Sequence, residues 1–193
     1  MLFKDVHHLI CDARHLGSLG GRLQSFKRLT HLELIDYTIP EEMGVFSAFK
    51  DTLSSITLEW CIMSKSSLVS LIEYFPKLQS LHIKALQAYD ESEEPTHQIS
   101  RTLEKLSVSG QEIRKHLIVR LSEDLSGLGL QVNELTLQWI RPEEDLDGGW
   151  TLYTDAVIGA FAASVKSLRM IPITNIFNGR SNPLRSYHRD SCS

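Results

Sequence analysis

The sequence lacks three features that are typical of particular classes of protein. Its longest apolar stretch, Ala156–Ala163, falls far below the roughly 20 residues that cross a bilayer. Its formal net charge of −4 comes without the basic stripe that neutralises phosphates in a duplex-DNA binder. The amino terminus carries one lysine followed by Asp5, which is not the pattern of a signal peptide. These absences predict a protein that binds neither nucleic acid nor membrane.

Cysteine is also scarce, with three in 193 residues. Three cysteines do not make the disulfide framework that stabilises many small secreted domains. The repeat described below places Cys11 and Cys61 two strands apart, about 9.6 Å at about 4.8 Å per strand. That separation exceeds the limit of about 7 Å for bridging two α-carbons. The sequence therefore predicts reduced thiols and an intracellular protein, in the cytoplasm or the nucleus.

The sequence does contain a repeat. An apolar residue, two variable residues, a second apolar residue, one variable residue and a third apolar residue recur seven times. Successive repeats start 23, 24, 25, 25, 29 and 33 residues apart, and the first four intervals match the roughly 20–29 residues of leucine-rich repeats. The triplets are Val6-Leu9-Cys11, Leu29-Leu32-Leu34, Leu53-Ile56-Leu58, Leu78-Leu81-Ile83, Leu103-Leu106-Val108, Val132-Leu135-Leu137 and Val165-Leu168-Met170.

Each triplet predicts a short strand with one buried face, because its second and third apolar residues alternate with other residues. At least 17 residues separate successive triplets, which is too many for a hairpin, so neighbouring strands should pair in parallel. Helical spacing of apolar residues predicts helices over Ser64–Phe75, Glu112–Leu125 and Asp155–Val165. Pro40–Lys50 is a fourth candidate, which Gly44 disfavours.

These patterns predict an α/β leucine-rich-repeat solenoid, an arc with a parallel concave sheet and with helices and loops on the convex side. We expect Leu32, Leu58, Leu81, Leu106 and Leu135 to be buried in one ladder. The alternative is a doubly wound α/β domain, whose strands would be continuous apolar runs because both faces are covered. The alternation seen in residues 32–34 and 81–83 favours the solenoid.

The predicted domain organisation is one repeat region followed by a tail. The repeat domain covers residues 1–171, with about seven repeats starting near residues 6, 29, 53, 78, 103, 132 and 165, and residues 172–193 form an irregular tail. The first repeat begins at Val6 without a polar cap before it, and no convex helix follows the last strand. We therefore expect a chain that is cut at its front.

One unit carries two further marks. Residues 53–61 form Leu-x-x-Ile-x-Leu-x-x-Cys ending at Cys61, and Phe75-Pro76 precedes the next strand. This unit resembles the leucine-rich repeats of fungal F-box proteins, which favour a cysteine at the ninth position and an aromatic–proline pair before the next strand. The resemblance covers residues 1–170 in style and implies a substrate receptor of a cullin-type ubiquitin ligase. In that family the F-box docks the ligase adaptor, so an adaptor partner is expected only if an F-box is encoded upstream.

Period-2 geometry identifies the residues that the concave face presents to a partner. They flank the two inward apolar residues of each strand and form a mixed polar face without a dominant charge, which suits a peptide or protein surface. The alternative is a solvated sheet without a partner. The candidate partner-binding residues are His8, His31, Glu33, Thr57, Glu59, His82, Lys84, Ser107, Thr136 and Gln138.

Two further groups are candidate contacts at the rim. Trp60 and Trp139 both stand two residues after a third apolar position, and tryptophan is enriched among interface hot spots; the alternative is local core between loops. Acidic residues recur at a similar offset after alternate strands, where they could steer a basic partner or simply be solvated. These edge residues are Glu41, Glu42, Asp90, Glu91, Glu93, Glu94, Glu143, Glu144 and Asp145.

No catalytic or cofactor site can be assigned from the sequence. His7, His8 and His31 fall on adjacent predicted strands, but no cysteine or carboxylate completes a metal-binding set at a recognisable spacing. Residues 17–21 lack the Gly-Lys-Ser/Thr ending of a phosphate-binding loop. No Ser-His-Asp or Cys-His arrangement can be nominated. We therefore expect a protein that is not an enzyme and holds neither metal nor cofactor.

Together these observations predict a monomeric scaffold that binds a protein partner on its concave face. The resemblance implies that it is the substrate-recognition part of an F-box-type ubiquitin ligase receptor. The alternatives are a ligase-independent repeat scaffold or regulatory module, and a truncated, non-functional fragment.

Overall fold

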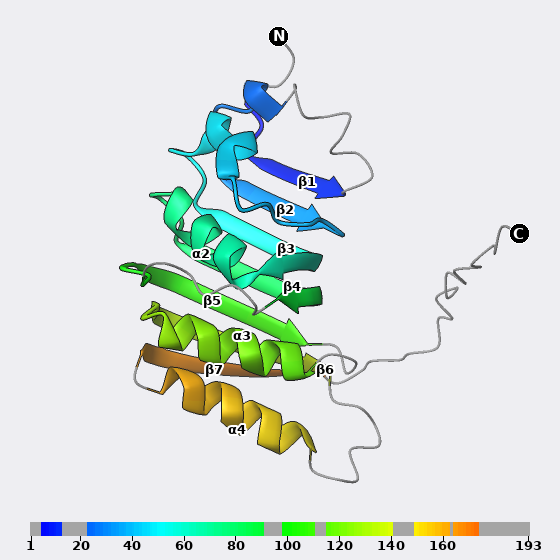
Figure 1. Cartoon of the computed structure of the whole chain (residues 1–193), viewed down its shortest axis with the longest axis vertical. Helices are drawn as coiled ribbons and strands as arrows, with labels where there is room; N and C mark the ends of the chain where they lie inside the picture. The colour runs from blue at the N-terminus through cyan, green and yellow to red at the C-terminus, as the bar shows by residue number, and fades with distance from the viewer. Residues whose placement is uncertain are drawn as a thin grey trace, which may run out of the picture.

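Seven strands form one sheet in the computed structural model, which describes residues 5–12, 23–90, 98–110, 115–140, 149–162 and 164–173. The strands follow one another in chain order, and every neighbouring pair is parallel (Figure 1). The strands are β1 (His8–Asp12), β2 (His31–Ile35), β3 (Ser55–Ser64), β4 (Ser80–Asp90), β5 (Thr102–Gly110), β6 (Gln131–Ile140) and β7 (Val165–Ile173).

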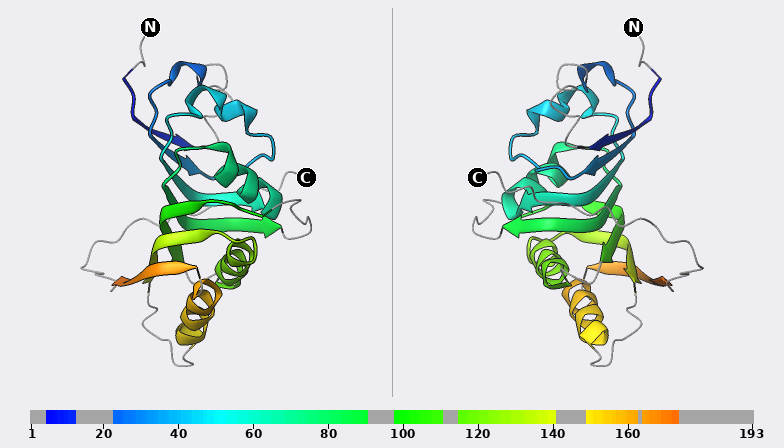
Figure 2. Two further views of the ribbon diagram at one scale, coloured as in Figure 1. Left: turned by 90° about the vertical axis from the view of Figure 1, so that its left-hand side faces the viewer. Right: turned by 90° about the vertical axis from the view of Figure 1, so that its right-hand side faces the viewer.

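The helices between the strands lie on one face of this sheet, as Figure 1 and Figure 2 show from three sides. This arrangement is the predicted α/β fold, in which sequential parallel strands and interspersed helices build a solenoid-like arc. The sheet face opposite α2, α3 and α4 is called the open face below. The helical segments are η1 (Leu23–Ser25), η2 (Met43–Phe49), α2 (Lys65–Tyr74), α3 (Lys115–Gly127) and α4 (Gly149–Phe161).

The segment Pro40–Lys50 forms a 3₁₀ helix, η2, rather than the α-helix considered for it. Met43, Phe46 and Phe49 recur at every third residue, and all three are buried. That spacing fits the 3.0 residues per turn of a 3₁₀ helix, so burial of this stripe favours the tighter geometry.

The other predicted helices form with shifted boundaries. α2 begins where predicted, because Ser64 and Ser67 make a capping box: the Ser67 N–H donates to Ser64 Oγ at 3.0 Å, and the Ser64 N–H donates to Ser67 Oγ at 2.9 Å. α3 occupies most of Glu112–Leu125, whose first three residues lie outside the described part. α4 starts at Gly149 and ends at Phe161, several residues before the predicted Asp155–Val165 at both ends.

The apolar positions of the repeat stack into ladders that form the core. The five leucines expected in one ladder are all buried, but Leu58 lies in the ladder of third positions, with Leu34 and Ile83. The expected single ladder is therefore wrong for Leu58, because it is the third apolar residue of its repeat. Ile56 takes its place, in the ladder of Leu9, Leu32, Ile56, Leu81, Leu106, Leu135 and Leu168.

A further set of buried residues precedes the strands, three or four positions before the first apolar residue of a repeat. The Phe49 and Phe75 rings are stacked, with their centroids 6.3 Å apart and an interplanar angle of 2°. Phe75 of the pair Phe75-Pro76 noted in the sequence is thus one of a set that recurs at this position of the repeat. Its members are Phe26, Phe49, Phe75, Ile99, Leu128 and Phe161.

Candidate partner-binding face

The open face carries a hollow of about 360 Å³ that is lined by residues from β1 to β6. In-register parallel strands place equivalent positions of successive repeats side by side, as in the pairing of Glu33 with Thr57 and of Thr57 with His82. The fold therefore gathers most of the ten predicted residues in one place. Those that line the hollow are His8, His31, Glu33, Thr57, His82, Lys84, Ser107 and Gln138.

Two predicted residues do not line the hollow. The Glu59 carboxylate lies beside it, 3.0 Å from Lys84 Nζ. Thr136 occupies the expected position on β6 but is only 3% exposed, and its hydroxyl donates to Glu134 Oε1 at 3.1 Å. The expected exposure of Thr136 is therefore not found, because this side chain is buried.

The hollow also includes two serines beyond the ten candidate residues. Ser55 lies between His31 and Ser80 in the register of β2, β3 and β4. Ser109, on β5, donates from its hydroxyl to the Lys84 carbonyl oxygen at 3.1 Å. Both serines stand at outward positions of the repeat, where the period-2 pattern places them on this face. The buried Leu32 and Ile83 complete the lining.

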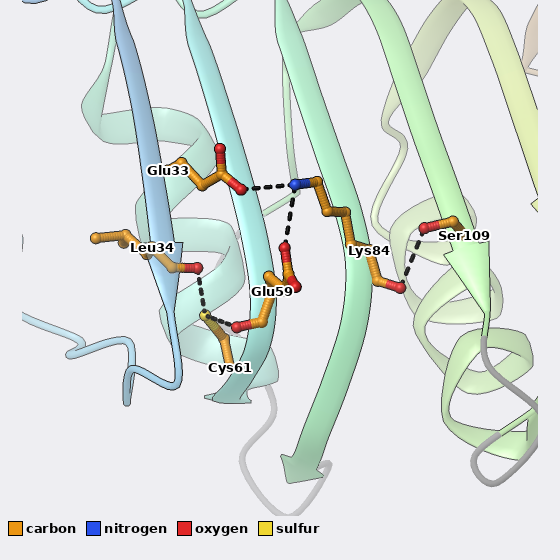
Figure 3. Close-up of polar contacts among 6 residues, drawn as sticks. All are labelled: Glu33, Leu34, Glu59, Cys61, Lys84 and Ser109. Carbon is orange, nitrogen blue, oxygen red and sulfur yellow. Dashed lines mark hydrogen bonds and ion pairs between the residues drawn. The ribbon is translucent and has the colours of Figure 1, made fainter. Parts of the chain in front are cut away.

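Three charged side chains meet at this hollow (Figure 3). Lys84 Nζ lies 2.6 Å from Glu33 Oε1 and 3.0 Å from Glu59 Oε2, so the ammonium joins side chains of β2, β3 and β4. Its hydrogen bond to Glu33 raises the pKa of Lys84; burial opposes this rise, and Glu59 supports it. Lys84 is also the extra residue of a β-bulge, since Leu58 pairs with Ile83 whereas Glu59 pairs with Ala85.

Histidines form a further polar part of the lining. The His8 and His31 rings lie 5.9 Å apart between centroids, and His31 Nδ1 is 2.8 Å from Thr30 Oγ1. Burial lowers the pKa of His82, and the charges of Lys105, Lys84 and His31 lower it further. His82 is therefore a neutral imidazole at pH 7, which offers one hydrogen-bond donor and one acceptor.

The predicted rim residues are only partly described. Trp60 is 36% exposed and has a left-handed backbone with a φ of 56°, so its indole is not the enclosed core residue of the alternative interpretation. Trp139 lies in β6, and its side chain is outside the described part. Of the acidic edge, Glu41 and Glu42 are exposed after β2, and Asp90 ends β4. The six edge residues outside the described part are Glu91, Glu93, Glu94, Glu143, Glu144 and Asp145.

Cys11 and Cys61 are both buried and unbridged, as predicted. The Cys61 thiol, at the ninth position of its repeat, donates to the Leu34 carbonyl oxygen at 3.4 Å and to that of Glu59 at 3.7 Å (Figure 3). Burial raises the pKa of Cys61 to about 11. The side chain therefore acts as a hydrogen-bond donor between strands rather than as a reactive thiolate.

No group of three or more His, Cys, Asp or Glu side chains that could bind a metal ion is found among the residues that the structure describes. In the same part of the chain, no helix has the length and apolarity to cross a membrane. Residues 17–21, considered above as a phosphate loop, lie outside this part.

Comparison with known proteins finds no matching family model and no matching curated protein.

Proposed function

We propose that the chain is a monomeric, non-enzymatic scaffold that binds a protein partner on its open face. The observation that carries this proposal is the hollow, where outward residues predicted from the repeat converge from β1 to β6. Its lining offers hydroxyl, imidazole, amide, carboxylate and ammonium groups. Such a mixture of donors and acceptors suits the polar surface of a peptide or protein.

Ile10 adds an apolar contact beside these polar groups. It lies on β1, pairs with Glu33 of β2 and is among the most exposed large apolar side chains of the described part. A partner that covers the hollow from β1 onward would bury this side chain, and burial of apolar area is favourable. The open face thus combines polar recognition with a site for hydrophobic contact.

We further propose that the scaffold is the substrate-recognition part of an F-box-type ubiquitin ligase receptor in a reducing compartment. Support comes from the resemblance of the unit that contains Cys61 and Phe75-Pro76, and from the unbridged state of Cys11 and Cys61. A second candidate is a ligase-independent scaffold or regulatory module. It would use the same open face, because the polar lining of the hollow does not depend on a ligase.

Affinity capture with matched variants tests the binding proposal. The open-face variant is Glu33→Ala/His82→Ala, and the control is Glu123→Ala/His116→Ala, which changes the same residue types at exposed positions of α3. We expect the open-face variant to lose most partner capture, whereas the control captures as the wild type does. Equal capture by all three proteins, at equal melting temperatures, would show that the open face is not the binding surface.

The ligase link has its own test. If an F-box is encoded upstream, we expect cullin and adaptor peptides among the proteins captured by the product that contains it, and no binding of purified adaptor to residues 1–193 alone. Micromolar or tighter binding of the adaptor to this chain would contradict the assumption that docking needs a separate F-box. Partner capture without cullin or adaptor would favour the ligase-independent scaffold.

A further inference from the structure

The Glu33 and Glu59 carboxylates converge on one ammonium nitrogen at the edge of the hollow. Both lie within 3.0 Å of one ammonium nitrogen, and their side chains are only 15% and 31% exposed. Two carboxylates this close repel each other unless a cation lies between them. Glu33 on β2 and Glu59 on β3 therefore form a site for one positive charge, called the receptor below. In this structure the Lys84 ammonium occupies it (Figure 3).

Lys84 is a replaceable occupant of that receptor. It reaches the carboxylates from a third strand, β4, and its side chain is 47% exposed, more than that of either glutamate. An ammonium on a flexible four-carbon arm is well hydrated, so the Lys84 arm can turn into solvent if a better cation arrives. The two carboxylates are less exposed than Lys84, so that cation must take the place of the ammonium between them.

We propose that the hollow receives an arginine side chain of the protein partner between Glu33 and Glu59, in place of the Lys84 ammonium. This inference rests on the proposed function and specifies the chemistry of its partner. A guanidinium is planar and presents several N–H donors in a fixed fork, so it can pair with two carboxylates at once. An ammonium has the charge but not this geometry.

The charges around the hollow favour a basic partner over an acidic one. Glu33 and Glu59 carry two negative charges against the single positive charge of Lys84. Lys105 and Glu134, farther along the sheet, lie 3.6 Å apart and offset each other. An acidic side chain at the receptor would meet two carboxylates, whereas an arginine that displaces Lys84 leaves the receptor's charge balance unchanged.

The test uses a blocked Gly-Ser peptide with one central arginine, and matched peptides with lysine or citrulline at that position. Binding to the whole chain is followed by NMR titration. Lys84→Met removes the internal competitor, and Lys105→Met removes one positive charge from the same face without freeing the receptor. We expect the arginine peptide to bind Lys84→Met about ten-fold more tightly than wild type, a change of about 1.4 kcal/mol, and to bind Lys105→Met as wild type.

Two further variants isolate the receptor. Glu33→Gln/Lys84→Met has the net charge of the wild type but only one receptor carboxylate. We expect this variant to bind the arginine peptide no more tightly than wild type does. Lys84→Gln should also bind the arginine peptide about ten-fold more tightly than wild type. This second variant shows that the result does not depend on a folding defect of Lys84→Met. The citrulline peptide, which has the shape of arginine without its charge, should not respond to any variant.

An equal gain in Lys84→Met and Lys105→Met, or no gain in either Lys84 variant, would overturn the inference. Equal binding of the citrulline and arginine peptides would overturn it as well. Capture of a protein partner that depends on the open face but contains no arginine at the contact would reject the arginine and leave the proposed function standing.

Discussion

Single polar side chains join several repeats to the one before by donating hydrogen bonds to its backbone carbonyls. Arg101, just before β5, donates to the carbonyl oxygens of Ile72, Phe75, Pro76 and Leu78, at and after the end of α2. Thr52 Oγ1 donates to the Leu29 carbonyl at 2.8 Å. These partners are 23 to 29 residues apart in the chain, so the apolar pattern could not have predicted them.

Replacing Arg101 should destabilise the fold more than replacing an exposed arginine. The last carbonyls of a helix have no partner within the helix, and leaving a buried acceptor unsatisfied costs about 1–3 kcal/mol. We expect Arg101→Met to lower the free energy of unfolding by about 2–3 kcal/mol, measured by urea denaturation. Arg169→Met, at an exposed position of β7, is the control and should change it by less than about 0.5 kcal/mol. Similar effects of both changes would contradict the capping role.

Cys61 should make the fold less stable at alkaline pH. Its pKa rises from 9.0 to about 11 on burial, so the folded state holds the thiol proton more tightly than the unfolded state does. That stabilisation is complete below pH 9 and is lost as the pH rises toward 11, by about 2–3 kcal/mol at about 1.4 kcal/mol per pKa unit. Cys61→Ala should lose less stability between pH 9 and pH 11 than wild type, measured by denaturation at each pH. An unchanged pH dependence would refute this role of the thiol.

Among the elements, the strands were the most predictable, because period-2 alternation is a local pattern that recurs in every repeat. The boundaries of the helices were less predictable than the strands. η2 has buried residues at every third position up to Phe49, which gives a 3₁₀ helix. α4 begins at Gly149, six residues before the segment Asp155–Val165 from which it was predicted. Trp150, Tyr153 and Val157 continue the helical spacing toward the amino terminus, so a longer window would have found that start.

The ladders predict that the same substitution has different costs along the arc. Leu81 and Leu168 belong to one ladder, but Leu81 is fully buried between β3 and β5, whereas Leu168 on β7 is 42% exposed. Leu81→Ala should cost about 2–5 kcal/mol through the cavity that it leaves. Leu168→Ala should cost clearly less, about 1 kcal/mol, because 42% of the Leu168 surface is already in water. Equal losses of unfolding free energy would show that the ladder is not the core.

At the scale of the whole molecule, repetition made much of the hollow predictable. Equivalent positions of successive repeats share a column, so residues as distant as His8 and Gln138 could be assigned to one surface. The Lys84 bridge was not predictable, because it joins residues 51 and 25 positions apart across a β-bulge. Thr136 was misjudged because period-2 geometry gives the face of a residue but not whether its neighbours cover it.

Histidine footprinting of the partner complex tests whether the partner binds the open face. His8 and His31 are exposed on the open face, whereas His116 is exposed on α3. An acylating reagent such as diethyl pyrocarbonate reports the accessibility of each imidazole in the free protein and in the complex. If a partner occupies the open face, labelling of His8 and His31 falls several-fold in the complex while labelling of His116 is unchanged. Protection of His116 with full labelling of His8 and His31 would place the partner on the helical face and contradict binding on the open face.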